Sequence, residues 1–468
     1  MSDKPRTFVP MLRFLGAAGT VTGSRFLLTT DASCALVDCG LFQGLKELRL
    51  RNWDKFPVRP AGIDAVMLTH AHLDHSGYIP GLCRDGFRGR VLATPTTQAL
   101  ARIVLPDSGH LQEEEAQYAN RRGYSKHTPA RPLYTEEDAL DALKHFSAVA
   151  FEQTIEVAPR ISATFRFAGH ILGASSILVE IDQRKKRRVL FSGDLGRPRH
   201  PILHAPSPVP DADVIVVEST YGDRRHDDDE SLKNFEQAIV RTAERGGVII
   251  VPSFAVDRTE VVLHYIRKAA QQGRIPQLPI YVDSPMALAA LAIYTGSIAQ
   301  RSAEIRSDVS AADLDPGNLT QVRSVDESIA LNALHGPMII ISASGMATGG
   351  RVLHHLANRL PDPRNTVILV GYQADGTRGR SLLNGDKTIK MLGRYIAVRA
   401  EIVNVPAFSV HADQAELIGW LRTAPHAPST CYVVHGEPAA ATALRDEIRH
   451  QLGWNAVVPR HLEAVRID

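Results

Sequence analysis

The sequence predicts an α/β protein whose core is interrupted by an inserted, Rossmann-like domain. In the first half, short apolar runs end directly at histidine, aspartate or glutamate. In the middle, four apolar runs are each followed by a small-residue turn and a helical pattern, which is typical of a parallel sheet with crossover helices. Near the C-terminus, another apolar run ends at a histidine. We therefore expect the core at residues 1–219 and 401–468, and the inserted domain at residues 220–400.

The composition is that of an ordinary globular protein. The chain has 468 residues, of which 44% are hydrophobic and 22% charged, and its formal net charge is +2. A net charge this small does not by itself indicate a nucleic-acid-binding protein, so any basic surface must be local. The four scattered cysteines form no Cys-x-x-Cys pair, which predicts reduced thiols and a cytoplasmic protein. Residues 1–6 carry no apolar signal core, and no apolar stretch has the length of a membrane helix, so we expect no membrane association.

The most informative segment is residues 70–75, which read His-Ala-His-Leu-Asp-His. They directly follow the apolar run 65–69, which predicts a buried strand. Neutral imidazole is a good zinc ligand, and a carboxylate can complete the coordination shell. Three imidazoles and one carboxylate at this spacing therefore predict two adjacent metal ions. The alternative is a histidine-rich solvated turn, but further ligand candidates recur downstream.

Acidic and imidazole side chains follow apolar runs elsewhere in the chain as well. If these strands lie side by side, their ends meet at one rim, the usual arrangement of catalytic residues on a rigid scaffold. Taken alone, a histidine after a strand is more often a polar residue in a turn. The strand-end side chains are Asp38 after 35–37, His170 after 164–168, Asp194 after 189–193, Glu218 after 214–217 and His435 after 431–434.

With these residues assembled, the chain resembles the metallo-β-lactamase superfamily, and within it the β-CASP nucleases, over essentially its whole length. The first four motifs define the superfamily, and the last three separate the nucleic-acid-cutting branch. The resemblance implies an αββα sandwich with an inserted β-CASP domain. No ligand is missing, so the chain does not resemble the inactive scaffolding members. The motifs in order are Asp38, the segment 70–75, His170, Asp194, Glu218, His411 and His435.

The resemblance also implies two Zn²⁺ per chain. Two such ions can share a hydroxide at neutral pH and clamp a phosphoryl group. Asp38 is expected to accept an N–H from a ligating histidine and so fix its tautomer. The implied ligands are His70, His72 and His170 for one ion, Asp74, His75 and His435 for the other, and Asp194 as the bridge between them.

Cleavage of a phosphodiester also requires a proton for the departing 3′ oxygen, and histidine suits that work. The resemblance gives this role to His411, with Glu218 orienting or charging it. The alternative for Glu218 is a strand-end carboxylate bound by a backbone amide. Asp413 and Glu416 predict a capping box at the start of the next helix, which would brace the loop that carries His411.

The resemblance implies single-stranded RNA lying between the core and the inserted domain. Segments 253–259 and 344–351 each follow a predicted strand and open a helix, where glycines let phosphates approach backbone N–H groups. Neither segment matches a P-loop, and segment 371–378 is expected to line the same cleft. The residues expected to contact RNA are Ser253, Arg258, Ser344, Gly345, Met346, Thr348, Gly349 and Tyr372.

The implied activity is hydrolysis of RNA by a metal-bridged hydroxide, with 5′-phosphate and 3′-hydroxyl products. Endonucleolytic and exonucleolytic action both stay open, as does a homodimer. One alternative is a small-molecule metallohydrolase of the same core fold, although such enzymes lack an insertion of this size. A second is a nucleic-acid-binding scaffold without catalysis, against which the intact ligand set argues.

Overall fold

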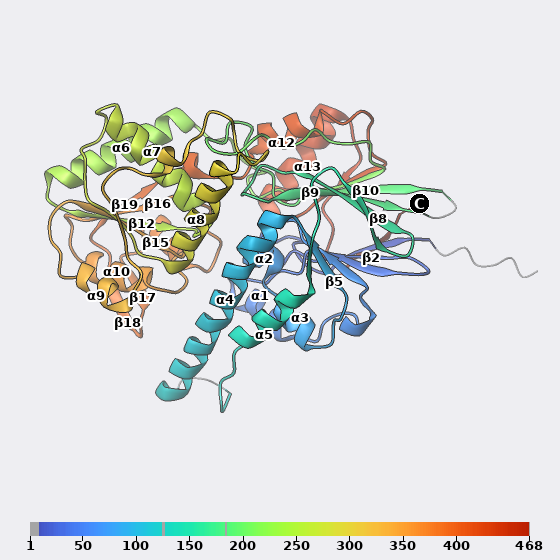
Figure 1. Ribbon diagram of the computed structural model, residues 1–468, viewed down its shortest axis with the longest axis horizontal. Helices are drawn as coiled ribbons and strands as arrows, with labels where there is room; N and C mark the ends of the chain where they lie inside the picture. The colour runs from blue at the N-terminus through green and yellow to red at the C-terminus, as the bar shows by residue number, and fades with distance from the viewer. Residues whose placement is uncertain (1–8, 124–126, 183–184, 468) are drawn as a thin grey trace, which may run out of the picture.

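The core of the molecule is a sandwich of two seven-stranded sheets (Figure 1). The computed structural model describes residues 9–123, 127–182 and 185–467, so the segment 1–6 discussed above lies outside it. The first sheet has the order β22 (Ala464–Arg466), β1 (Met11–Phe14), β2 (Phe26–Thr29), β3 (Cys34–Val37), β4 (Ala65–Met67), β5 (Arg90–Ala93), β6 (Phe146–Ala148). The second has the order β21 (Ala456–Val457), β20 (Thr430–Val433), β11 (Val214–Val217), β10 (Arg187–Phe191), β9 (Ser175–Ile181), β8 (Ile161–Phe167), β7 (Thr154–Ala158).

Buried aromatic rings join the two sheets face to face. Side chains alternate along a strand, so every second residue can point into the space between the sheets. The rings of Phe14 and Tyr432 are 5.1 Å apart, and those of Phe26 and Phe191 are 5.7 Å apart. Each pair takes one ring from either sheet. This packing fixes the stacking, and the loops that follow strands of both sheets meet at one edge.

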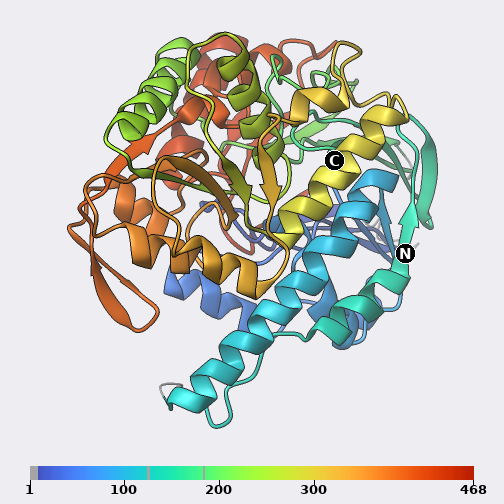
Figure 2. The same ribbon diagram turned by 60° about the vertical axis from the view of Figure 1, so that its left-hand side comes forward.

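Helices cover the outer faces of the sandwich. The 28-residue helix α4 (Pro95–Arg122) begins after the N-cap Thr94 and is terminated by Gly123, whose φ of 65° is left-handed. It runs along the inserted domain and contacts α8 (Pro285–Ala299) (Figures 1 and 2). The other core helices are α1 (Lys46–Leu50), α2 (Leu73–Ser76), α3 (Ile79–Arg84), α5 (Glu136–Ala142), α12 (Gln414–Leu421) and α13 (Pro438–Leu452).

The inserted domain is a six-stranded, all-parallel sheet with helices on both faces. Ile249 and Val251 face a core shared with α6 (Asp228–Glu244), α7 (Arg258–Gln271) and α8. Val248 and Ile250 face a second core with α9 (Val325–Leu331), α10 (Val352–Arg359) and α11 (Arg378–Leu383). Burial on both faces explains the continuous apolar runs. The order is β14 (Leu319–Gln321), β13 (Ile280–Val282), β15 (Met338–Ala343), β12 (Val248–Ser253), β16 (Thr366–Leu369), β19 (Glu401–Asn404).

All four strands expected in this domain are present, and the sequence analysis did not anticipate the edge strands β14 and β19. Because β19 pairs in parallel with β16, the inserted sheet extends past the boundary drawn at residue 400. A hairpin of β17 (Thr388–Met391) and β18 (Arg394–Ala397) lies beside it. The αββα sandwich with an inserted parallel domain confirms the predicted fold class.

The four cysteines are free thiols. Burial raises the pKa of Cys39, Cys83 and Cys431 to about 12, so these three thiols stay protonated at neutral pH and are poor nucleophiles. Within the described ranges, no helix is both long and apolar enough to cross a membrane.

Candidate metal centre

Loops after three core strands bring four predicted ligands together. His70 and His72 follow β4, His170 follows β8, and Asp194 follows β10. The Nδ1 atom of His72 lies 3.2 Å from Nε2 of both His70 and His170. Oδ2 of Asp194 lies 3.5 Å from Nε2 of His70 and 3.6 Å from Nε2 of His170. Four ligand atoms thus surround one point.

The remaining predicted ligands surround a second point. Nε2 of His75 lies 3.1 Å from Nε2 of His435, and that nitrogen lies 3.4 Å from Oδ2 of Asp74. Oδ1 of Asp194 lies 3.1 Å from Nε2 of His75. Asp194 therefore turns one carboxylate oxygen toward each group, as the predicted bridge requires.

The two groups fit divalent cations. A tetrahedral zinc ion with ligands at about 2.0–2.1 Å separates neighbouring ligand atoms by about 3.4 Å. The separations here run from 3.1 to 3.6 Å. Burial lowers the pKa of His72 to about 4, and it also holds the pKa values of His70 and His170 well below their usual range. Neutral imidazole is the form that binds metal, so the three rings of the first group are ready for a cation. In the second group, the nearby carboxylates outweigh burial and raise the pKa values of His75 and His435, so a cation there has to displace protons from those rings.

Asp38 lies where the sequence placed it, next to a candidate ligand. Its Oδ2 is 2.7 Å from Nδ1 of His75, leaving Nε2 of that ring for the metal group. The backbone N–H and the hydroxyl of Thr69 donate to the same carboxylate at 2.8–3.0 Å. Such a carboxylate orients a ligating ring and fixes its tautomer.

Unusual backbone conformations aim these side chains. Asp38 has φ 59° and His435 has φ 50°, a left-handed region that residues other than glycine rarely adopt. Gly169, immediately before His170, has φ 64°. A Cβ on Gly40 would lie 1.6 Å from the backbone oxygen of Asp74, so only glycine fits there. Strain of this kind persists where the surrounding packing over-determines it, commonly at functional sites.

The predicted acid pair, His411 and Glu218, stands beside the first group. Nδ1 of His411 is 3.2 Å from Oε1 of Glu218 and 3.9 Å from Oδ2 of Asp194. Glu218 is fully buried and also accepts from the backbone N–H of Leu195 at 2.7 Å. The Glu218 carboxylate therefore contacts both the imidazole of His411 and a backbone amide. The capping box of Asp413 and Glu416 is present at the start of α12.

Two aromatic side chains of the inserted domain reach the metal centre. The ring of Phe254 lies 6.2 Å from that of His72, and both Gly345 and Gly371 pack against it. Tyr372, one of the predicted RNA contacts, stacks edge-on against Tyr221 at 5.6 Å. Phe254 was not among the predicted contacts, because nothing in its local sequence separates an active-site ring from a core ring.

The other predicted RNA contacts divide into buried and partly exposed residues. Ser253 is fully buried, and Arg258, only 4% exposed, donates to the backbone oxygen of Phe408. Burial leaves neither side chain free to contact RNA in this structure. Through its bond to Phe408, Arg258 instead joins the inserted domain to the loop of His411. Around Gly345, Ser344 bonds Thr348 at 2.8 Å, and the partly or fully exposed side of this turn includes Met346, Thr348 and Gly349.

A buried polar network at the domain junction holds the loop of His170. Tyr294 of α8 donates to Asp257 at 2.6 Å and accepts from the backbone N–H of Leu172 at 2.9 Å. Asp257 also bonds His200 of the core at 3.1 Å. Glu304 accepts from the backbone N–H of Gly173. The sequence offered no signal for this network, because each partner reads as an ordinary helix or loop residue.

Comparison with known proteins agrees with this architecture. Residues 18–92 match the Metallo-beta-lactamase superfamily, residues 259–382 match the Beta-Casp domain, and residues 395–459 match the Zn-dependent metallo-hydrolase RNA specificity domain. A solved structure of a protein of unknown function from Enterococcus faecalis aligns with 98% of this chain and 100% of its own, with a TM-score of 0.51 at 13% identity. That likeness concerns the fold alone.

Three curated relatives are similar over most of the chain. Ribonuclease TTHA0252 of Thermus thermophilus is 36% identical over 92% of this chain and 94% of its own length. The RNase J-like protein of Methanocaldococcus jannaschii is 31% identical over 91% and 92%, respectively. Transcription termination factor FttA of the same organism is 30% identical over 97% of this chain and 71% of its own length.

The sandwich and its strand-end ligands define a metal-dependent hydrolase of the metallo-β-lactamase superfamily. The parallel domain inserted between Glu218 and His411 separates it from the simpler members of that superfamily. The chain belongs to the β-CASP family.

Proposed function

We propose that this protein is a zinc-dependent ribonuclease that hydrolyses phosphodiester bonds of single-stranded RNA and leaves 5′-phosphate and 3′-hydroxyl ends. The observation that carries the proposal is the His411–Glu218 pair standing directly beside two buried groups of metal-competent side chains. The names of the relatives and the matched RNA specificity domain support RNA as the substrate. The cytoplasm is the proposed location.

The side chains around the metal centre have distinct tasks in this proposal. When bound, two zinc ions would supply an activated water as the nucleophile and neutralise charge on the phosphate. His411 delivers a proton from Nε2 to the departing 3′ oxygen, while Glu218 holds Nδ1 of the same ring. Asp38 holds Nδ1 of His75 and so keeps Nε2 directed at the second group.

The aromatic residues at the domain junction support the proposal that the substrate is single-stranded. Unpaired bases can stack on aromatic rings, a contact that tolerates any sequence. Phe254 and Tyr372 are partly exposed and lie close to the metal groups and to Tyr221, respectively. A strand whose bases stack there would place a neighbouring phosphate at the ligands.

Digestion of single-stranded RNA, labelled at one end or internally, tests the proposal. We expect Asp74→Ala and His411→Ala each to lower cleavage by about 10²-fold or more. Only Asp74→Ala should also lower bound zinc, measured by elemental analysis, because the proposal makes Asp74 a ligand and His411 the acid, although Asp194, Glu218 and His411 also form a group that could hold an ion. His450→Ala, at an exposed position on α13, is the matched control and should change neither quantity.

Each outcome of this experiment has a reading. Equal zinc loss in His411→Ala would make that residue a ligand and contradict its role as acid. A zinc-loaded wild type that leaves RNA intact and hydrolyses small esters or lactones would favour a small-molecule metallohydrolase. The release of label from internal positions, compared with the ends, separates endonucleolytic from exonucleolytic action.

A further inference from the structure

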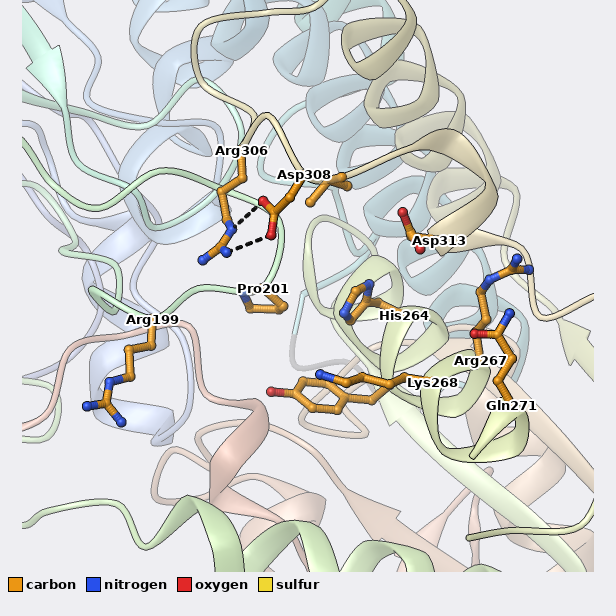
Figure 3. Close-up of a pocket in the computed structure, with 11 residues that line it drawn as sticks. Arg199, Pro201, His264, Arg267, Lys268, Gln271, Arg306, Asp308 and Asp313 are labelled. Carbon is orange, nitrogen blue, oxygen red and sulfur yellow. Dashed lines mark hydrogen bonds and ion pairs between the residues drawn. The ribbon is translucent and has the colours of Figure 1, made fainter. Parts of the chain in front are cut away.

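A cavity separate from the metal centre lies between the two domains, and none of the metal-centre residues lines it (Figure 3). Its volume is about 430 Å³, within the range of small-molecule sites. The core contributes Arg199 and Pro201, and α7 contributes His264 and Lys268, which extend toward the core loop in Figure 3. The segment 306–313 closes the remaining side. Both domains therefore supply walls to this space.

The lining carries an excess of positive charge. Arg306 is neutralised by Asp308 through two contacts of 2.9 and 3.0 Å. Asp313 is engaged by the hydroxyl and backbone N–H of Ser310. Among the residues that the structure describes, neither Arg199 nor Lys268 has an ion-pair partner. Two cationic groups are thus left for a ligand.

Buried hydrogen-bonding atoms also lack partners here. Nδ1 of His264 and Nε of Arg267 are buried and have no hydrogen-bond partner among the described residues. A buried polar atom without a partner costs free energy, so an occupant with acceptor oxygens would stabilise the site. Burial lowers the pKa of His264, which leaves a neutral ring able to donate or accept. Guanidinium, ammonium and imidazole together are the groups that bind phosphate oxygens.

We propose that this cavity binds the phosphate groups of a nucleotide or of an oligonucleotide, as a site separate from the metal centre. The volume admits more than one phosphate, which points to a diphosphate or to a nucleotide unit with its base. An occupant would touch both domains near the catalytic loops. Pro201 follows His200, which bonds Asp257, and the ring of Tyr265 packs on Phe408 at 5.1 Å.

Calorimetric titration of the full chain tests this site. The background variant His411→Ala prevents turnover, and the probes are adenosine 5′-diphosphate and a short single-stranded oligoribonucleotide. Charge reversal by Lys268→Glu or Arg199→Glu should lower the affinity for at least one probe by about tenfold or more. Both side chains are exposed, so folding should be retained, and Lys268→Gln provides a milder second variant. Lys233→Glu, an exposed position on α6, is the charge-matched control.

The two probes separate the sources of phosphate. Loss confined to the diphosphate identifies a free nucleotide as ligand, and loss confined to the oligonucleotide identifies an RNA phosphate. Either result, or loss of both, supports the site. For the oligonucleotide, the slope of log affinity against log salt should also fall by about one. Equal affinities of Lys268→Glu and Lys233→Glu for both probes overturn the proposal.

The oligonucleotide part of this inference rests on the proposed ribonuclease function, and the two fail in different ways. Failure of the function appears as intact RNA with the wild type, while the diphosphate titration still reports on the cavity. Failure of the cavity appears in the titration alone, while the wild type continues to cleave.

Discussion

The phenol oxygen of Tyr294 lies 2.9 Å from the backbone nitrogen of Leu172, two residues beyond the candidate ligand His170. One residue belongs to α8 of the inserted domain and the other to a loop of the core. Both are fully buried, and the same phenol donates to Asp257 at 2.6 Å. The inserted domain therefore helps to hold the loop that carries a candidate metal ligand.

Replacing Tyr294 by phenylalanine tests this coupling. The change leaves the N–H of Leu172 and a carboxylate oxygen of Asp257 without partners, which should lower the free energy of unfolding by about 1–3 kcal/mol. The loosened loop of His170 should also release zinc more readily to a competing chelator. Tyr395→Phe, 72% exposed on β18, is the control for loss of a hydroxyl. Unchanged zinc retention in the Tyr294 variant would limit the network to a structural role.

Glu218→Gln separates orientation of His411 from metal binding. Glutamine keeps the shape of the side chain but removes the charge 3.2 Å from Nδ1 of His411. We expect kcat for RNA cleavage to fall by about 10²-fold, with little change in KM and full zinc content. Steady-state kinetics and elemental analysis measure the three quantities. A rise in KM with constant kcat would place Glu218 in substrate binding instead.

Phe254→Ala tests the stacking surface. Loss of one base–aromatic stack should weaken the binding of single-stranded RNA by about 1–3 kcal/mol, which would be seen as a higher KM. Because the Phe254 side chain has no atom that coordinates metal and its ring lies 6.2 Å from that of His72, zinc content should not change. Tyr395→Ala removes an exposed ring of the same domain and should have no effect. Equal RNA affinity of Phe254→Ala and wild type would contradict the proposal that an RNA base stacks on Phe254.

Glu260 gives a prediction about pH. Its carboxylate is fully buried, and burial, reinforced by the nearby charge of Asp257, raises its pKa well above the usual 4.5. The folded chain keeps this group protonated at pH values where the unfolded chain ionises it. The contribution of Glu260 to stability is therefore complete below about pH 4.5 and is lost as pH rises toward the folded pKa.

Glu260→Gln removes this titration. With metal removed by a chelator at both pH values, we expect the variant to be more stable than wild type near pH 7, by about 1 kcal/mol or more, and nearly equal to it near pH 4. Chemical denaturation at the two pH values provides the measurement. The same stability difference at both pH values would mean that Glu260 is already ionised in the folded chain.

The sequence revealed the candidate ligands because each lies just after an apolar strand, a pattern visible within a few residues. The sandwich then brings together His75 and His435, which are 360 positions apart. Interactions across the domain junction have no such local sequence pattern. Leu172 and Tyr294 are 122 positions apart, and neither stands in a motif. Arg258, a plausible surface cation by sequence, is buried because its guanidinium bonds the backbone of Phe408.

Strand β20 lies between β11 and β21 in the second sheet, and β22 pairs with β1 in the first. Both halves of the sandwich are thus completed by segments that are translated after the whole inserted domain. A ribosome that has made every earlier ligand still carries an unfinished sheet and lacks His435. We therefore expect the nascent polypeptide to lack a complete metal centre, and with it hydrolytic activity, during nearly all of its own synthesis.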